Sequence, residues 1–328
     1  MTRTRSPHAS ARLRRFGIRL MAVTSGVLFV LQVSASAASP VGISASGANG
    51  SGTTDKPGVA CADGGSGASW MYGYDASLDP GEFSGLPGQL HLDLEIHSEA
   101  PDYDSAWMPP GESSVLLQNT RGTLGLDLAA GSGACGSEDL AFDGTTASGS
   151  GTWAVPGMGG TGSYRQATGS GTHSFMASVG PGAGNPFLIN LSGSLSVLQP
   201  SLSVEVVSAS WEPGNIDKDF KFATVTFRAT NTGPGDSFGA RFLSATSSGG
   251  GSTPAGPAPQ TLGDIAEGDS ALFVQRYRFE RKQPCQPKES GGCSFDSSLS
   301  IELPDALDIP ATYTDDVHVR VPTSPGGH

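Results

Sequence analysis

The sequence predicts an all-β fold made of two antiparallel domains, the first a barrel or sandwich and the second a sandwich. Short stretches of alternating apolar and polar residues recur between clusters of Gly and Ser, as in hairpin-rich β proteins. No stretch combines sustained helical periodicity with helix caps. The chain contains 47 Gly and 23 Pro, yet Val, Leu, Ile and Phe persist between them. This composition favours turn-rich β structure over disorder.

The clearest strand is predicted at residues 89–97, with the sequence QLHLDLEIH. Side chains two residues apart project from the same face of a strand. One face therefore carries four apolar residues, and the opposite face carries His91, Asp93, Glu95 and His97. This pattern predicts a strand with one face in a core.

Further strands of similar length follow at hairpin spacing, which predicts antiparallel pairing. In the first domain, residues 57–198, they are expected at 114–119, 123–128, 139–142, 150–155, 171–179 and 186–198. In the second domain, residues 200–322, they are expected at 202–211, 220–230, 272–279, 298–303 and 317–321. Residues 38–56 are expected to form a flexible Ser/Gly tether, and residues 323–328 a loose tail.

The first 37 residues have the three parts of a secretion signal. Six arginines and no acidic residue precede the apolar run 20–31, and small residues at Ala35 and Ala37 define a cleavage site. An uncleaved membrane anchor is the alternative, because residues 16–37 are just long enough to span a bilayer. We expect cleavage after Ala37, with a secreted product and no integral membrane association.

The charge of the mature chain restricts its partners. Without the leader, 13 basic residues face 31 acidic ones, a formal charge of −18. Such a chain repels phosphate backbones and anionic lipids, so we expect no nucleic-acid partner. The sequence predicts a monomer whose partner is an unidentified protein or glycan.

The four cysteines, Cys61, Cys135, Cys285 and Cys293, are expected to form disulfide bonds, because an even number in an exported chain is typical of a disulfide framework. Three pairings are open. Proximity in the sequence favours Cys61 with Cys135 and Cys285 with Cys293. No C-x-x-C spacing indicates a metal site.

The second half resembles the immunoglobulin-like repeats of bacterial extracellular proteins. TVTFRATNTGPG at 224–235 is similar to the strand that ends in the Asn-x-Gly turn of those repeats. TLGDIAEGDSA at 261–271 is similar to their turn before the next strand, and 298–305 with 313–321 to their closing strand pair. The resemblance covers about residues 200–322 and implies an immunoglobulin-like β-sandwich that acts as a spacer or contact module.

One hairpin of the first half resembles the barrels of the dirigent and allene-oxide-cyclase families. GTWAVPGMGGTGSYRQATGSGT at 151–172 has their aromatic strand, Gly-Gly-Thr-Gly-x-aromatic turn and Gly-rich return strand. Gly160 and Gly162 are expected to allow a tight turn with positive φ. The resemblance implies a barrel with a pocket for a small hydrophobic molecule.

The polar face His91, Asp93, Glu95 and His97 is the run of residues with the most potential for metal binding or catalysis. Imidazoles and carboxylates at this spacing could share a metal or serve acid–base catalysis. The simpler interpretation is the solvated side of an amphipathic strand, because no third partner is identifiable. Without a nucleophile elbow or a phosphate loop, we expect no enzyme activity and no cofactor.

The sequence therefore favours a secreted, non-catalytic protein of extracellular or cell-surface interaction, with the second domain as spacer or contact module. One alternative is a small-ligand-binding or cyclase-like barrel, with His91 or Glu95 facing an enclosed pocket. The other is a carbohydrate-binding protein, which needs Trp70, Tyr103 or Trp107 exposed. We expect these aromatic residues, together with Tyr72 and Tyr74, to fill the core instead.

Overall fold

The computed structural model confirms the all-β class and describes the chain in nine segments. They comprise residues 39–49, 54–56, 67–80, 82–99, 105–157, 159–179, 184–213, 220–280 and 292–322. All of them belong to one compact unit, Ser36–His328. Strands pair antiparallel throughout, and one short 3-10 helix, η1 (Gly162–Tyr164), lies between β9 and β10. The predicted leader and the predicted tail lie outside the described residues.

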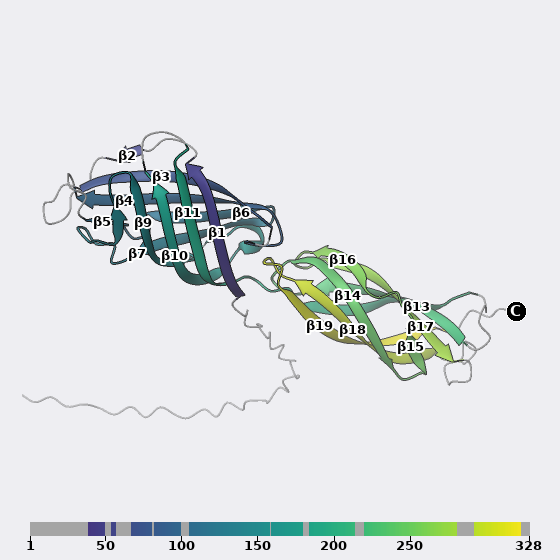
Figure 1. Cartoon of the computed structure of the whole chain (residues 1–328). Helices are drawn as coiled ribbons and strands as arrows, with labels where there is room; N and C mark the ends of the chain where they lie inside the picture. The colour runs from purple at the N-terminus through teal and green to yellow at the C-terminus, as the bar shows by residue number, and fades with distance from the viewer. Residues whose placement is uncertain are drawn as a thin grey trace, which may run out of the picture. The chain divides into compact units, whose positions relative to one another are not determined.

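Eight strands of the first half form a closed antiparallel barrel (Figure 1). Each strand pairs with the next along the chain, and the last strand pairs with the first. The eight are β1 (Ser39–Asn49), β3 (Gly67–Leu78), β4 (Gly88–Glu99), β6 (Ser113–Asn119), β7 (Gly122–Ala130), β9 (Thr146–Ala154), β10 (Thr168–Ser178) and β11 (Pro186–Ser196). Short strands β2 (Thr54–Lys56), β5 (Ala106–Trp107) and β8 (Leu140–Phe142) pair with β3, β4 and β9. Closure joins the two ends of the sheet to each other.

Strand β1 corrects the expectation of a flexible tether over residues 38–56. Ten of its residues pair with β11, from Ser39 opposite Leu195 to Ala48 opposite Pro186. Among the side chains of this strand that the structure describes, Ile43 and Ala45 belong to the apolar core. Its sequence, SPVGISASGAN, has few large apolar residues and therefore a weak apolar signal. The strand forms because its backbone groups complete the hydrogen bonding of β11. It therefore closes the barrel.

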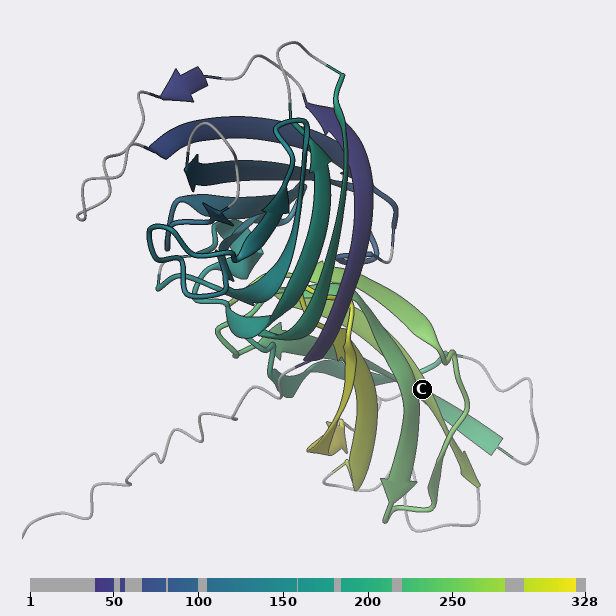
Figure 2. The same cartoon turned by 60° about the vertical axis from the view of Figure 1, so that its left-hand side comes forward.

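The barrel strands curve around a common apolar core (Figure 2). Leu90, Leu92, Leu94 and Ile96 are completely buried, which confirms the predicted alternation of residues 89–97. Trp153 lies beside Gly171 and Gly193, where an added Cβ would come within about 2.6 Å of the indole ring. These glycines leave the space that the indole occupies.

The second half is a sandwich of two four-stranded sheets. One sheet has the order β12 (Leu202–Trp211), β13 (Phe220–Asn231), β17 (Ser270–Glu280), β15 (Ser252–Pro254). The other has the order β16 (Gln260–Ile265), β14 (Ser237–Ser248), β18 (Cys293–Pro304), β19 (Pro310–Val321). Phe273 stacks on Phe227 and Phe242 at 5.3 and 4.7 Å between ring centroids. Aromatic side chains from both sheets thus form the centre of this core.

Each predicted strand overlaps one observed strand, and the observed strands are mostly longer by one to several residues. The sequence did not predict β3, β14 or β16, nor the short strands β2, β5 and β15. Cys135 and Cys293 are each disulfide-bonded. Their partners, and with them the pairing, lie outside the described residues, as do Cys61 and Cys285.

Candidate functional site

The predicted polar face of β4 is divided into two parts with different environments. His91 and Asp93 are partly exposed on the outer wall of the barrel, whereas Glu95 and His97 are 3% and 6% exposed. The expectation of one solvated face is therefore wrong for the second pair. The inner face of the strand is occupied by leucine and isoleucine, so none of the four lies on the core side.

His91 is held between two carboxylates. Its Nδ1 is 2.7 Å from Asp75 Oδ1, and its Nε2 is 3.1 Å from Asp93 Oδ1. Only the imidazolium form can donate from both nitrogens. Partial burial lowers the pKa of His91, but the hydrogen bond to Asp75 and the two negative charges outweigh it and raise the pKa above its usual value. The three side chains form a clamp across β3 and β4.

Glu95 and His97 form a second, buried pair, with 3.0 Å between Glu95 Oε1 and His97 Nε2. Trp107 of β5 lies directly opposite His97, with their rings 5.8 Å apart, and is itself 3% exposed. Ser113 Oγ accepts a hydrogen bond from the Glu95 backbone N–H at 2.9 Å. Trp107 and Ser113 thus cover the part of the outer face of β4 that the alternation of residues 89–97 alone would place in solvent.

These groups have the chemistry of metal ligands but not the arrangement. Across the described residues, no three His, Cys, Asp or Glu side chains are placed to hold a metal ion. In His91 both ring nitrogens already bind carboxylates, which leaves neither nitrogen to accept a proton from a substrate. His91 is therefore not placed to act as a general base.

The predicted aromatic cluster lies in the interior where its members are described. Tyr72, Tyr74 and Trp107 are 4%, 0% and 3% exposed. Burial also raises the pKa of Tyr74. The side chain of Trp70 and the whole of Tyr103 lie outside the described residues. Trp107 does not form the exposed sugar-stacking surface that the carbohydrate alternative required.

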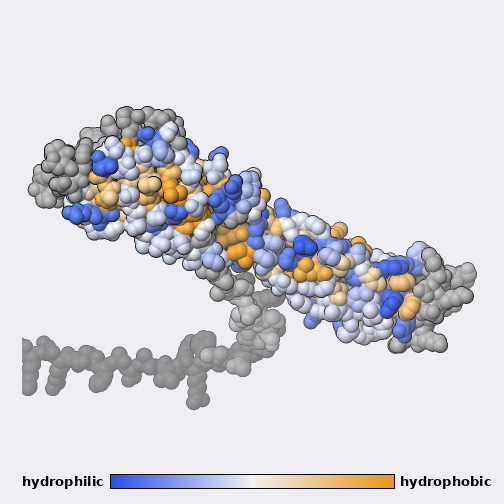
Figure 3. Space-filling model, in the orientation of Figure 1, coloured by the Kyte–Doolittle hydropathy of each residue, from blue (hydrophilic) through white to orange (hydrophobic). Residues whose placement is uncertain are grey.

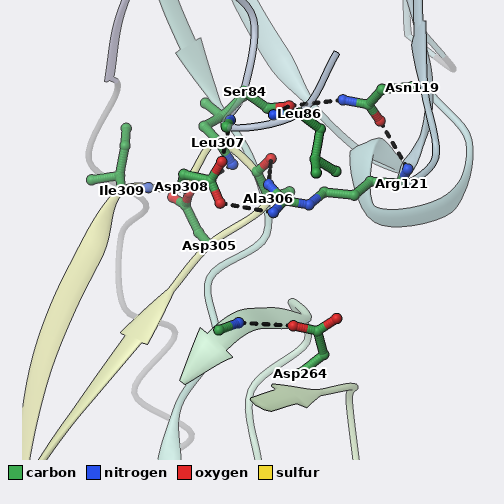
Figure 4. Close-up of polar contacts among 12 residues, drawn as sticks. Ser84, Leu86, Asn119, Arg121, Asp264, Asp305, Ala306, Leu307, Asp308 and Ile309 are labelled. Atoms are coloured by element: carbon green, nitrogen blue, oxygen red, sulfur yellow. Dashed lines mark hydrogen bonds and ion pairs between the residues drawn. The ribbon is translucent and has the colours of Figure 1, made fainter. Parts of the chain in front are cut away.

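A second cluster, which the sequence did not predict, joins the barrel to the sandwich (Figure 4). Arg121, in the turn between β6 and β7, has a side chain only 8% exposed. It donates to the Ala306 carbonyl at 3.0 Å and to Asp308 Oδ1 at 2.8 Å. Its guanidinium carbon lies 3.9 Å above the ring of Phe238, a cation–π contact. We call this group the junction.

Internal hydrogen bonds hold the loop 305–309, between β18 and β19, in the conformation that contacts Arg121. Asp305 Oδ1 accepts from the backbone N–H groups of Leu307 and Ile309, at 2.8 and 3.1 Å. Asp308 adopts a φ of 60°, the left-handed region that Asp tolerates better than most residues. Its second oxygen accepts a hydrogen bond from the backbone N–H of Gly85. Ala306 belongs to the apolar core of the barrel although it follows β18 of the sandwich.

The hairpin that resembles the dirigent barrels also contributes to the junction. Tyr164 is completely buried and accepts a hydrogen bond from Asn119 Nδ2 at 2.7 Å. Gly162 has a φ of 57°, as the turn requires. Gly160 lacks a positive φ, but its added Cβ would lie 2.1 Å from the Tyr164 carbonyl. Position 160 therefore requires glycine, because any side chain would collide with the Tyr164 carbonyl.

Three further hydrogen bonds extend the junction at its rim. Arg165 donates to Glu267 Oε2 at 2.6 Å and to the Pro234 carbonyl at 2.7 Å. Ser163 donates to Asp236 Oδ2 at 2.8 Å. Partners in these pairs are separated by 69 to 102 residues, so no local pattern could have predicted them.

In the described part of the chain, no helix has the length and apolar character needed to cross a bilayer. Comparison with known proteins adds no relative, since neither a protein-family model nor a curated protein matches the chain.

Proposed function

We propose that the protein is an exported, non-catalytic protein of extracellular or cell-surface interaction, in which the sandwich is a contact module that holds the barrel. The main support for this proposal is the junction, where side chains of the sandwich and the barrel pack against each other. A spacer would need only a covalent link between the domains, whereas here Arg121 is buried against Asp308 and Ala306 enters the barrel core.

The side chains of the candidate face support binding over catalysis. His91 is fixed by two carboxylates, and its raised pKa favours the charged form, which is a poor general base. Clamped side chains lose little conformational entropy when a ligand binds, which favours recognition.

The surface also suits such a role. The face that carries β1, β11, β10 and β9 shows hydrophobic residues scattered among hydrophilic ones (Figure 3). Met176 and Leu188, which lie opposite each other on β10 and β11, are 55% and 37% exposed. The mature charge of −18 from 13 basic and 31 acidic residues favours neutral or basic partners.

Binding of fluorescently labelled residues 38–328 to intact cells that lack their own copy of the gene tests the proposal. We expect saturable binding that unlabelled protein displaces. A parallel screen against ester, glycoside and peptide substrates should show no turnover. Turnover that disappears in His97→Gln, which alters the buried pair on the same strand, would overturn the non-catalytic assignment.

A ligand-binding barrel is the second candidate, and His173 favours it. This residue is 3% exposed on the face of β10 that also carries the core residues Phe175 and Ala177. Its Nε2 donates to the Ala129 carbonyl at 3.0 Å, while its Nδ1 has no hydrogen-bond partner among the described residues. Burial lowers the pKa of His173, which keeps Nδ1 an acceptor at neutral pH.

Titration with N-phenyl-1-naphthylamine, a neutral fluorescent amine, tests this second candidate. Saturable binding by the wild type that is lost in His173→Phe would support an occupied interior. Equal fluorescence of both proteins would exclude His173 from binding the probe.

A further inference from the structure

A hollow of about 420 Å³ lies on the outer wall of the barrel, beside the His91 clamp. Strands β3, β4 and β6 place two rows of side chains there. Ser77, Gln89 and Gln118 form one row, and Asp75, His91 and Leu116 form the next. The volume is within the range of roughly 300–1,000 Å³ that is usual for small-molecule sites.

The lining groups both donate and accept hydrogen bonds. Each glutamine amide offers two N–H donors and a carbonyl acceptor, and the Ser77 hydroxyl can do either. Leu116 is 39% exposed and supplies an apolar patch in the same hollow. A ligand that matches this lining has several hydroxyl groups and an apolar C–H face.

The charge of the hollow excludes anions. The side chain of Asp75 is 63% exposed, and the described residues that line the site include no lysine or arginine. A carboxylated or sulfated ligand would meet the Asp75 and Asp93 charges, with one imidazolium between them.

The site is held in shape before any ligand arrives. His91 is bonded on both sides, and Gly73 lies beneath it on β3. A Cβ at Gly73 would lie 3.2 Å from the His91 Cε1 atom and 3.7 Å from Asp93 Oδ1. Glycine at this position therefore lets the clamp lie close to the sheet.

We propose that this hollow binds a neutral saccharide, whose hydroxyl groups meet the two glutamine amides and the Asp75 carboxylate. The apolar face of a sugar ring packs on Leu116. This inference rests on the proposed function, because it names the class of ligand that the barrel recognises outside the cell.

A titration of isotope-labelled residues 38–328 by NMR tests the inference. The probes are maltotriose, cellotriose and chitotriose, with trigalacturonic acid as the anionic comparison. We expect at least one neutral probe to shift the backbone amides of residues 75–77, 89–91 and 116–118 saturably, and the acidic probe to leave them unchanged. Gln118→Ala should weaken that binding by about five- to tenfold, the effect of one lost hydrogen bond.

Asn190→Ala is the matched control, since it removes an exposed amide from β11 of the same barrel. It should leave the affinity unchanged. The inference is overturned if no neutral probe shifts the amides of the hollow at about 10 mM, a concentration that detects even weak binding. It is equally overturned if the shifts map to another surface. Either result leaves the cell-binding test intact, so failure of this site is distinguishable from failure of the proposed function.

Discussion

Replacing Arg121 with methionine should destabilise the protein through the junction. Methionine retains an unbranched apolar side chain but removes the charge-assisted hydrogen bond to Asp308 and the bond to the Ala306 carbonyl. Breaking a buried ion pair by removing one partner costs roughly 3–5 kcal/mol. Two features reduce this figure here. Asp308 is 31% exposed and regains some hydration, and the buried Arg121 Nε, which has no hydrogen-bond partner among the described residues, is removed as well.

We therefore expect a loss of about 2–3 kcal/mol in the free energy of unfolding. For a chain of this size, such a loss corresponds to a melting temperature lower by about 3–5 °C. Urea titration followed by tryptophan fluorescence measures it, because Trp107 and Trp153 lie in the barrel and Trp211 lies in the sandwich. A change in the urea midpoint without a change in slope would indicate lost stability alone.

Arg228→Met is the matched control. Arg228 forms an ion pair with Glu205 at 2.6 Å, but the two side chains are 43% and 60% exposed. Exposed pairs contribute about 0–1 kcal/mol. If the two substitutions lower stability equally, the buried junction does not stabilise the protein as we infer.

Three other perturbations test separate parts of the structure. Because the folded-state pKa of His91 is raised, its stabilisation is present below the unfolded value of about 6.5 and is lost as pH rises through the folded pKa. His91→Gln should therefore lower the urea midpoint more at about pH 5.5 than at about pH 8.5, and equal losses at both pH values would contradict the clamp. Asn231→Ala should cost about 2–4 kcal/mol in urea titration, because this completely buried amide makes four hydrogen bonds to backbone groups, and a loss below about 1 kcal/mol would refute that role. A mature chain shortened to begin at residue 50 lacks β1 and should lose the cooperative unfolding of the barrel by circular dichroism, whereas cooperative unfolding without β1 would show that closure is dispensable.

The alternation of residues 89–97 predicted the inner face of β4 correctly because four consecutive inward positions are apolar and all are buried. The same alternation misplaced Glu95 and His97. Period-two patterning separates the two faces of a strand, but it does not say whether a later segment will cover the outer one. Trp107 covers it here.

The tether expectation failed for a related reason. Residues 39–49 have few large apolar side chains, so their local signal is that of a linker. Their ten pairings to β11 involve residues about 140 to 156 positions away. Backbone hydrogen bonds form with any residue type, so these pairings leave no pattern in the local sequence.

Local periodicity and residue counts were enough to establish the all-β class, most strand positions and the acidic composition. The closure of the barrel, the burial of the Glu95–His97 pair and the junction of Arg121 with Asp308 depend instead on tertiary packing. Arg121 and Asp308 are 187 residues apart. Contacts of that kind depend on how completed elements pack, and a single sequence has no local pattern that records them.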